Sequence, residues 1–363
     1  MTQEKDPWPY AARIIHLVGG CRAINNPGPI VNFEPVTVEG KAEQFKIDTY
    51  GSIYLRLEAL GIGIIGVDFY THILEFKRIK LPQWRSFQRA KNTSWPVWEI
   101  AQKWSNIAYA AFKNKIGKLW DIGSRISHQL NVCDWRLREI SESYRNQLSA
   151  KIRGNDFEVG QSFEDDFTWL AYLSIQSFLV DACILRDYLA EFVSEFIYNE
   201  SKITRMSSLK NKILNKTTSN DYLIQNIKQQ TSEDGWIKLL GDYRNLIVHY
   251  APLALAERRL FSVCDKLTIG ENICLPIIRC PIPENPARIS ASRYSSNHFA
   301  NFEDQLNVFA KAAKGDIPII DGLDYASAVL GNLATLLELA AEKSPIAPEI
   351  MVFKGSNYIV KKL

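Results

Sequence analysis

Apolar positions recur with a helical period over much of the chain and lose that period only near the N-terminus. Residues 1–51 mix Pro, Gly and Asn, with a short alternating stretch at residues 33–38, which predicts loops and one candidate strand. Residues 52–80 are strongly apolar, and residues 95–152 contain long runs of helix formers interrupted only by isolated glycines. The N-terminal region is therefore predicted to be mostly helical.

A polar break that contains glycines separates this region from the rest of the chain. It comprises Gly154-Asn155 and Gly160-Gln161-Ser162, and it is the best candidate boundary, although one core could still span it. We therefore expect two units. Residues 1–155 form a mostly helical region, a candidate for binding RNA or a partner, and residues 156–363 form a second helical domain.

The second half of the chain has the pattern of a helical bundle. Residues 165–198 predict one long helix with apolar side chains on more than one side, as in a helix buried centrally or at an interface. Gly270-Glu271-Asn272 lies between two apolar runs and predicts a hairpin at residues 267–275. Further helices are predicted at residues 221–230, from Trp236 behind the capping candidates Ser232 and Asp234, at residues 299–314 and at residues 324–343. The predicted fold class is mainly α, with a helical bundle and a small β-hairpin in the C-terminal half.

Composition changes this picture little. The 363 residues are 46% hydrophobic and carry a formal net charge of only +3, so contacts with nucleic acid must come from local patches. The chain opens without the layout of a secretory signal, and no uninterrupted apolar run approaches the roughly 20 residues of a membrane-spanning helix. We therefore expect a cytoplasmic protein without a membrane segment. The six cysteines form no CxxC pair, and no metal or other cofactor is predicted.

One short pattern carries chemistry. It reads Trp236-Ile-Lys-Leu-Leu-Gly-Asp-Tyr-Arg244-Asn245-Leu-Ile-Val-His249-Tyr250. At about 100° per residue its apolar side chains form one stripe, which leaves Arg244, Asn245 and His249 on the other side of the helix. The same Arg-to-His spacing recurs at Arg293 and His298, but in a Ser- and Pro-rich stretch where no helix would fix the geometry. The first match is therefore the candidate site.

Arg244, Asn245 and His249 resemble the Arg-x4–6-His motif of the HEPN superfamily, a group of helical ribonucleases and toxins. In that family the motif lies near the end of a helix that follows a long apolar helix, and the resemblance here covers residues 160–260. It implies metal-independent cleavage of RNA by a homodimer whose two motifs meet across a shared cleft. It also implies a toxin or antiviral-defence effector with an inhibitory or activating protein partner. By the same resemblance Asn245 would orient the substrate or the histidine.

The residue types suit cleavage of RNA through its own 2′-hydroxyl. Histidine moves protons near neutral pH, so His249 would serve as general base or acid. The forked guanidinium of Arg244 would hold the phosphate as negative charge grows on it. On one α-helix, residues five apart diverge by about 140°, so a single dyad fits one phosphate poorly and two copies would do better.

Two other classes of function stay open. The first is a catalytically inert HEPN-like interaction module, in which Arg244 and His249 are ordinary surface residues. The second is a nucleotide-sensing module. Gly61-Ile-Gly63-Ile-Ile-Gly66 matches the dinucleotide-binding fingerprint as a string, but no acidic residue follows about 20 positions on. We interpret these glycines as sites where chain segments pack closely.

Two basic segments are candidates for RNA binding. The first combines positive charge with aromatic residues that could stack on bases, and its members are Lys77, Arg78, Lys80, Trp84, Arg85 and Arg89. Its alternative interpretation is a solvated basic face beside core tryptophans. The second segment contains Lys210 and Lys212, closer in sequence to the motif, and could guide RNA toward it.

Overall fold

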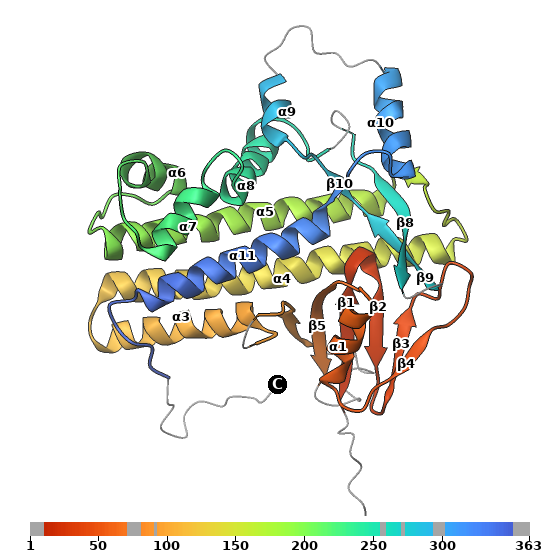
Figure 1. Ribbon diagram of the computed structural model, residues 1–363, viewed down its shortest axis with the longest axis horizontal. Helices are drawn as coiled ribbons and strands as arrows, with labels where there is room; N and C mark the ends of the chain where they lie inside the picture. Colours follow the sequence, from red (N-terminus) through yellow and green to blue (C-terminus); the bar gives the residue numbers. More distant parts are fainter. Residues whose placement is uncertain are drawn as a thin grey trace, which may run out of the picture.

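The structure, a computed structural model, describes residues 11–70, 81–90, 93–254, 259–269, 273–292 and 302–350. Its N-terminal part is a six-stranded antiparallel sheet in the order β4-β3-β2-β1-β5-β6 (Figure 1). The strands are β1 (Ala12–Leu17), β2 (Arg22–Asn25), β3 (Ile30–Glu34), β4 (Gln44–Lys46), β5 (Ile64–Tyr70) and β6 (Gln83–Ser86). The prediction of a mainly α fold with a mostly helical N-terminal region is therefore wrong, and the protein has a mixed α and β fold.

The central strands were missed because both faces of the sheet are covered. His16 in β1 and Asp68 in β5 are buried on the face that contacts the long helix α4 (Gly117–Arg153), through Ser141 and Arg138. On the other face the sheet packs against the short helix α1 (Ser52–Ala59). Buried polar residues on one face and apolar residues on the other remove the alternation that marks a half-exposed strand.

Four long helices form the centre of the molecule: α3 (Pro96–Lys113), α4, α5 (Asp166–Phe192) and α11 (Gly322–Glu342). Figure 1 shows them side by side, with the sheet below one end of α4. Their starts follow from local chemistry, because Pro96 has no N–H to leave unsatisfied and Asp165 accepts a hydrogen bond from the Thr168 amide (2.8 Å). Asp321 caps α11 in the same way through the Leu323 amide (3.0 Å).

The shorter elements cover α5 and the upper end of the molecule in Figure 1. The predicted hairpin exists and is longer than expected, since β8 (Ser262–Ile269) pairs antiparallel with β9 (Ile273–Arg279), and β7 (Ser162–Phe163) adds a third strand. The remaining elements are η1 (Val18–Gly20), η2 (Val193–Ile197), α6 (Met206–Leu209), η3 (Lys210–Leu214), α7 (Tyr222–Gln230), α8 (Trp236–Asn245), η4 (Leu246–Tyr250), β10 (Pro281–Ile282), α9 (Pro286–Ser292), α10 (Phe302–Lys314) and β11 (Ile320–Asp321).

Buried side chains from the sheet, the helices and the hairpin join one large hydrophobic cluster. Large aromatic residues tie distant elements together within it while keeping their polar ends paired. Trp104 in α3 donates to the Leu337 carbonyl in α11 (3.1 Å), and Tyr172 in α5 donates to the Pro281 carbonyl (2.6 Å). The cluster has members on both sides of residue 155, where we expect a boundary, and that division stays a prediction.

Residues Asp166–Ile197, which comprise α5 and its extension η2, are long and apolar enough to cross a membrane by length and composition. Half of the most apolar window of this helix is buried inside the protein. The core helix of a globular protein meets the same two criteria.

Candidate active site

Helix α8 carries the first half of the Arg-to-His motif and packs against α5. Its buried side chains Ile237, Leu240 and Tyr243 recur every three residues, which fixes one face of the helix against the core. The helix begins after Gly235, whose extended backbone forms the N-cap without a side-chain hydrogen bond. The helix starts at Trp236 as predicted, but its N-cap is Gly235 and neither Ser232 nor Asp234 caps it.

The second half of the motif lies in a π-helical turn. The amide of Ala251 donates to the carbonyl of Leu246 at 3.0 Å, five residues back rather than four. Such turns are rare, and they occur often at functional sites. Because a π-turn winds more residues into each revolution than an α-turn, it brings the side chains of residues i and i+5 closer to one face. The divergence expected between Arg244 and His249 on a regular α-helix is therefore an overestimate for this chain.

The three motif residues are accessible from solvent. Arg244 is half-buried, whereas Asn245 and His249 are exposed. Arg244 Nη1 donates to Asn245 Oδ1 at 3.4 Å, so the asparagine contacts the guanidinium directly. The ring of His249 lies 6.1 Å from that of Tyr250, centroid to centroid, in an edge-on orientation. The structure thus leaves a half-buried cation, an exposed amide and an exposed imidazole at the end of one helix.

A second guanidinium, which the sequence did not single out, lies beside this helix. A Cβ atom at Gly241 would sit 3.0 Å from Arg186 Nη1, so the Arg186 side chain from α5 crosses α8 one turn before Arg244. Asp187 Oδ1 accepts from Arg186 Nη2 at 3.0 Å and from the Met206 amide at 3.0 Å. Asp187 therefore fixes the guanidinium of Arg186 and holds the start of α6 against α5. In the sequence, Arg186 stands out only as the single arginine in an otherwise largely apolar predicted helix.

The first basic segment does not form the stacking strip that the sequence suggested. Trp84 is only 5% exposed and its indole N–H donates to the Asp134 carbonyl at 2.9 Å, so it cannot stack on a base. Arg89 is exposed, but its Nε and Nη2 both donate to the Glu58 carboxylate. Arg85 is half-buried and stacks on Trp98. Lys77, Arg78 and Lys80 lie outside the described residues.

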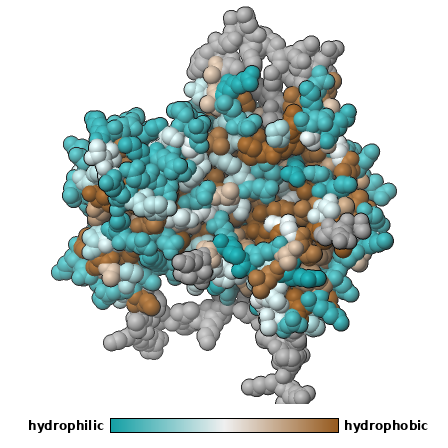
Figure 2. Space-filling model, in the orientation of Figure 1, coloured by the Kyte–Doolittle hydropathy of each residue, from teal (hydrophilic) through white to brown (hydrophobic). Residues whose placement is uncertain are grey.

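The second basic segment forms α6 and η3. The Lys210 ammonium is partly buried and donates to the Thr231 carbonyl at 2.6 Å, which ties η3 to the end of α7. Lys212, which also lies in the π-turn η3, is exposed. Figure 2 shows a largely hydrophilic surface over the region of α6 and α7. Of this pair, Lys212 remains a candidate for contacting RNA, and Lys210 has a structural partner.

The glycines of the apparent dinucleotide fingerprint are packing positions, as we interpret them from the sequence. Gly66 lies inside β5, where a Cβ atom would come within 2.1 Å of the Trp84 ring. Gly63 is likewise closed by Val18, at 2.6 Å. The fingerprint requires its glycines in a turn between a strand and a helix. These residues instead lie in and before a strand, so they form no phosphate-binding loop.

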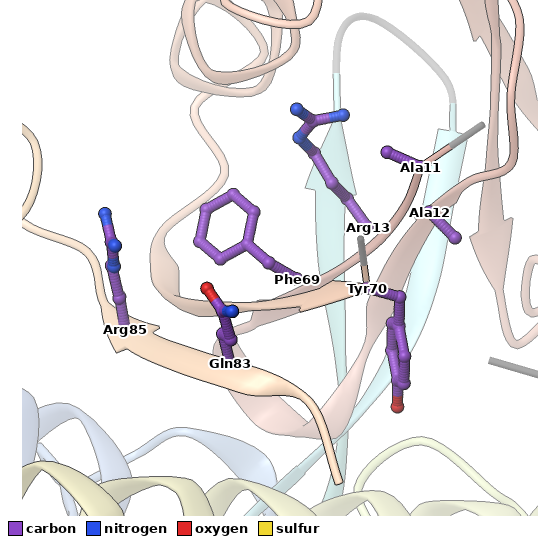
Figure 3. A pocket seen from close by; sticks show the side chains of 7 residues that line it. All are labelled: Ala11, Ala12, Arg13, Phe69, Tyr70, Gln83 and Arg85. Atoms are coloured by element: carbon purple, nitrogen blue, oxygen red, sulfur yellow. The ribbon is translucent and has the colours of Figure 1, made fainter. Parts of the chain in front are cut away.

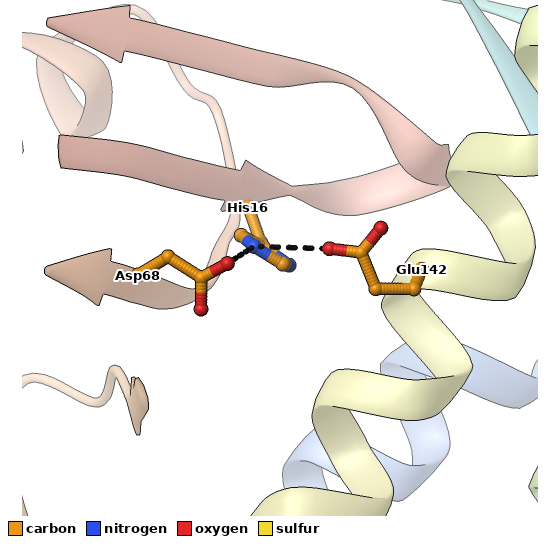
Figure 4. Close-up of side chains that lie close together, drawn as sticks. All are labelled: His16, Asp68 and Glu142. Atoms are coloured by element: carbon orange, nitrogen blue, oxygen red, sulfur yellow. Dashed lines mark ion pairs between the residues drawn. The ribbon is translucent and has the colours of Figure 1, made fainter. Parts of the chain in front are cut away.

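A buried cluster of polar side chains, also missed from the sequence, joins the sheet to α4. His16 Nε2 lies 3.2 Å from Asp68 Oδ2 and 3.6 Å from Glu142 Oε1 (Figure 4). The three possible ligand atoms lie within 4.8 Å of one another, which is compact enough for a metal ion. The residues are far apart in sequence and share no spacing pattern, so only the fold brings them together.

Two arginines already balance the carboxylates of this cluster. Arg138 donates two hydrogen bonds to Asp68 (2.8 and 2.7 Å), and Arg22 Nη2 lies 3.6 Å from Glu142 Oε1. Burial, followed by the charge of Arg22, lowers the pKa of His16 to about 4, so the imidazole is neutral at physiological pH. Burial raises the pKa of Asp68, but hydrogen bonds from Arg138 and His16 outweigh it and lower that pKa to about 2. With its charges balanced, the cluster offers no excess negative charge to a cation and acts as a clamp between sheet and helix.

Comparisons with protein-family models, with curated protein sequences and with solved structures gave no match to this chain. A functional assignment therefore rests on the residues of this chain and their geometry. The residues of the predicted motif lie together at the junction of α8 and η4.

Proposed function

We propose that this protein is a metal-independent endoribonuclease whose reaction is carried by Arg244 and His249. The observation that most supports the proposal is the junction of α8 with the π-turn η4. At this junction Arg244 is half-buried and His249 is exposed, and the geometry of a π-turn favours a smaller angle between residues five apart than an α-helix gives. Asn245 contacts Arg244 and belongs to the same site.

In the proposed reaction the 2′-hydroxyl of RNA attacks the adjacent phosphorus atom. A histidine takes the proton of that hydroxyl, and the 5′-oxygen leaves with a proton supplied by a protonated histidine or by water. The products are a 2′,3′-cyclic phosphate and a 5′-hydroxyl, so atoms balance without water entering the bond that breaks. Arg244 donates two hydrogen bonds to the phosphate oxygens as their charge increases, and Asn245 holds the guanidinium in place.

A homodimer completes the proposed site. Two copies would supply two histidines, so that one accepts a proton while the other donates one, as the resemblance to HEPN ribonucleases implies. Arg186 from α5 approaches Gly241, about one turn of α8 before Arg244, and Asp187 pairs with its guanidinium. The role of a toxin or defence effector, restrained or triggered by a protein partner, belongs to this proposal and follows from the resemblance alone.

The proposal is tested with four substitutions in the full chain. Arg244→Ala and His249→Ala should each reduce cleavage of a mixed RNA substrate by at least about 100-fold. His128→Ala and Arg153→Ala remove an exposed histidine and an exposed arginine elsewhere, and should leave the rate unchanged. Circular dichroism and thermal unfolding check that all four variants fold. Equal rates for wild type and His249→Ala would refute the proposal.

A further inference from the structure

A hollow of about 210 Å³ opens at the end of the N-terminal sheet, lined by residues of β1, β5 and β6 (Figure 3). Strand register builds one side of it, because Arg13 in β1 pairs with Phe69 in β5, and Phe69 pairs with Gln83 in β6. Paired residues of neighbouring strands point to the same face of a sheet. Arg85, two positions after Gln83, therefore shares that face, and Figure 3 shows the two guanidiniums on either side of the Phe69 ring.

Aromatic rings, rather than carboxylates, hold both guanidiniums. The Arg13 guanidinium lies 3.6 Å from the centre of the Tyr50 ring, and that of Arg85 lies 4.0 Å from the centre of the Trp98 ring. Both are 5.8 Å from the Phe69 ring. Stacking of this kind fixes the plane of a guanidinium and leaves its N–H donors, which lie in that plane, available to another group.

Neither of these two arginines forms an ion pair with a described carboxylate, although the charge of Arg85 interacts with the buried Asp134 carboxyl. Other described arginines form ion pairs, such as Arg138 with Asp68 and Arg89 with Glu58. No described carboxylate lies within ion-pair distance of Arg13 or Arg85, and Arg13 Nη1 is buried without a hydrogen-bond partner among the described groups. A buried cationic donor without an acceptor is costly unless an anion occupies the site.

We propose that the Arg13–Arg85 hollow binds the phosphate group of a nucleotide. Each forked guanidinium can donate two hydrogen bonds to phosphate oxygens, and the Phe69 ring offers a face to the adjoining base or sugar. Gln83 adds an amide that can both donate to and accept from the same ligand. The phosphate can belong to a free mononucleotide or to an RNA strand. These two sources are distinguished by whether 5′-AMP or a single-stranded RNA binds to the site.

This site is independent of the proposed ribonuclease reaction. In Figure 1 the long helices α4 and α5 lie between the sheet that carries Arg13 and the helix α8 that carries Arg244. A phosphate bound at the sheet therefore contacts neither Arg244 nor His249. The arrangement puts a binding site for a ligand on one side of the helical layer and the proposed catalytic motif on the other.

The test is isothermal titration calorimetry of the wild-type chain with 5′-AMP, adenosine, inorganic phosphate and a 2′-O-methyl octauridylate that lacks the attacking hydroxyl. Arg13→Gln and Arg85→Gln remove the two guanidiniums one at a time. Arg89→Gln is the matched control, because Arg89 follows the same strand but is exposed and paired with Glu58. Thermal unfolding confirms folding, and Arg85→Gln still tests the site if Arg13→Gln does not fold.

We expect 5′-AMP to bind and adenosine not to bind, with affinity lower by about tenfold or more in Arg13→Gln and Arg85→Gln and unchanged in Arg89→Gln. Binding of the octauridylate alone, with the same pattern of losses, would identify an RNA strand as the source of the phosphate. The proposal is overturned if no phosphate-bearing probe binds, or if all three variants lose affinity equally. Because none of the probes can be cleaved, these outcomes do not depend on ribonuclease activity.

Discussion

Arg244 lies in the last turn of α8 and His249 lies in the π-turn that follows, which is closed by a hydrogen bond from the Ala251 amide to the Leu246 carbonyl (3.0 Å). The extra residue in that turn changes where the histidine points relative to the arginine. A spacing that looks unfavourable on a regular α-helix is thereby compatible with one shared substrate.

Asn245 is expected to position Arg244 rather than to touch the reacting atoms. Asn245→Ala removes the contact to the guanidinium and should lower kcat by about tenfold, through a less ordered phosphate-binding group. Asn245→Gln, which keeps the amide, should recover part of the loss. Single-turnover cleavage measures both variants, and equal rates for wild type and Asn245→Ala would remove this residue from the site.

RNA binding should respond to Lys212 and not to Trp84. Lys212 is exposed, so Lys212→Ala should weaken RNA binding and reduce the slope of log affinity against log salt by about 1. Trp84→Phe should leave affinity unchanged, because the indole is buried and bonded to the Asp134 carbonyl. Filter binding of non-cleavable RNA at several salt concentrations measures both effects. A large loss of affinity in a folded Trp84→Phe would contradict the burial of this side chain.

The clamp between the sheet and α4 should contribute strongly to stability. Asp68→Asn leaves the partly buried Arg138 without its carboxylate, and we expect the free energy of unfolding in urea to fall by about 3 to 5 kcal/mol. Glu58→Gln is the control, because it breaks a similar two-bond pair with Arg89 at the surface and should cost less than about 1 kcal/mol. Similar losses for the two variants would show that burial of the Asp68 pair has no special effect.

Asp134 should make stability depend on pH. Burial raises the pKa of this carboxyl from 3.8 to about 6, even though its Oδ1 accepts from the Ser86 amide. Between these values the folded chain binds more protons than the unfolded chain, so this group lowers stability as pH rises from about 4 to about 6. Asp134→Asn keeps the acceptor and removes the charge, so its advantage over wild type should grow across that window, to about 3 kcal/mol near pH 7.

Urea unfolding at several pH values measures the Asp134 effect. Asp316→Asn, at an exposed aspartate, should show no such pH-dependent advantage. A constant difference between Asp134→Asn and wild type from pH 4 to pH 7 would mean that Asp134 is ionised over the whole range.

The sequence predicted the elements whose signals are local. The β8–β9 hairpin was found because a Gly-Glu-Asn turn lies between two apolar runs, and α11 was found from its apolar stripe. The sheet was not found, because buried His16 and Asp68 interrupt the apolar pattern of β1 and β5, and their partners lie on α4. Tertiary pairing of charged groups has no signature at short range.

For the candidate site too, the residues that are close in sequence were predicted and those brought together by the fold were not. Arg244, Asn245 and His249 are close in sequence, and their place on the polar side of an amphipathic helix, rather than spacing alone, selected them as the candidate motif. The π-turn could not be predicted, because no single residue type specifies it, and Arg186 joins the site only through its approach to Gly241. Trp84 was assigned to an RNA-binding strip because composition does not distinguish a buried tryptophan from an exposed one.

The most direct measurement is cleavage of mixed structured and single-stranded RNA in EDTA by wild type and His249→Ala, with analysis of the fragment ends. We predict that wild type alone cleaves, and that its fragments end in 2′,3′-cyclic phosphate and 5′-hydroxyl groups. Cleavage that EDTA abolishes, or that His249→Ala retains, would contradict a metal-independent reaction carried by Arg244 and His249.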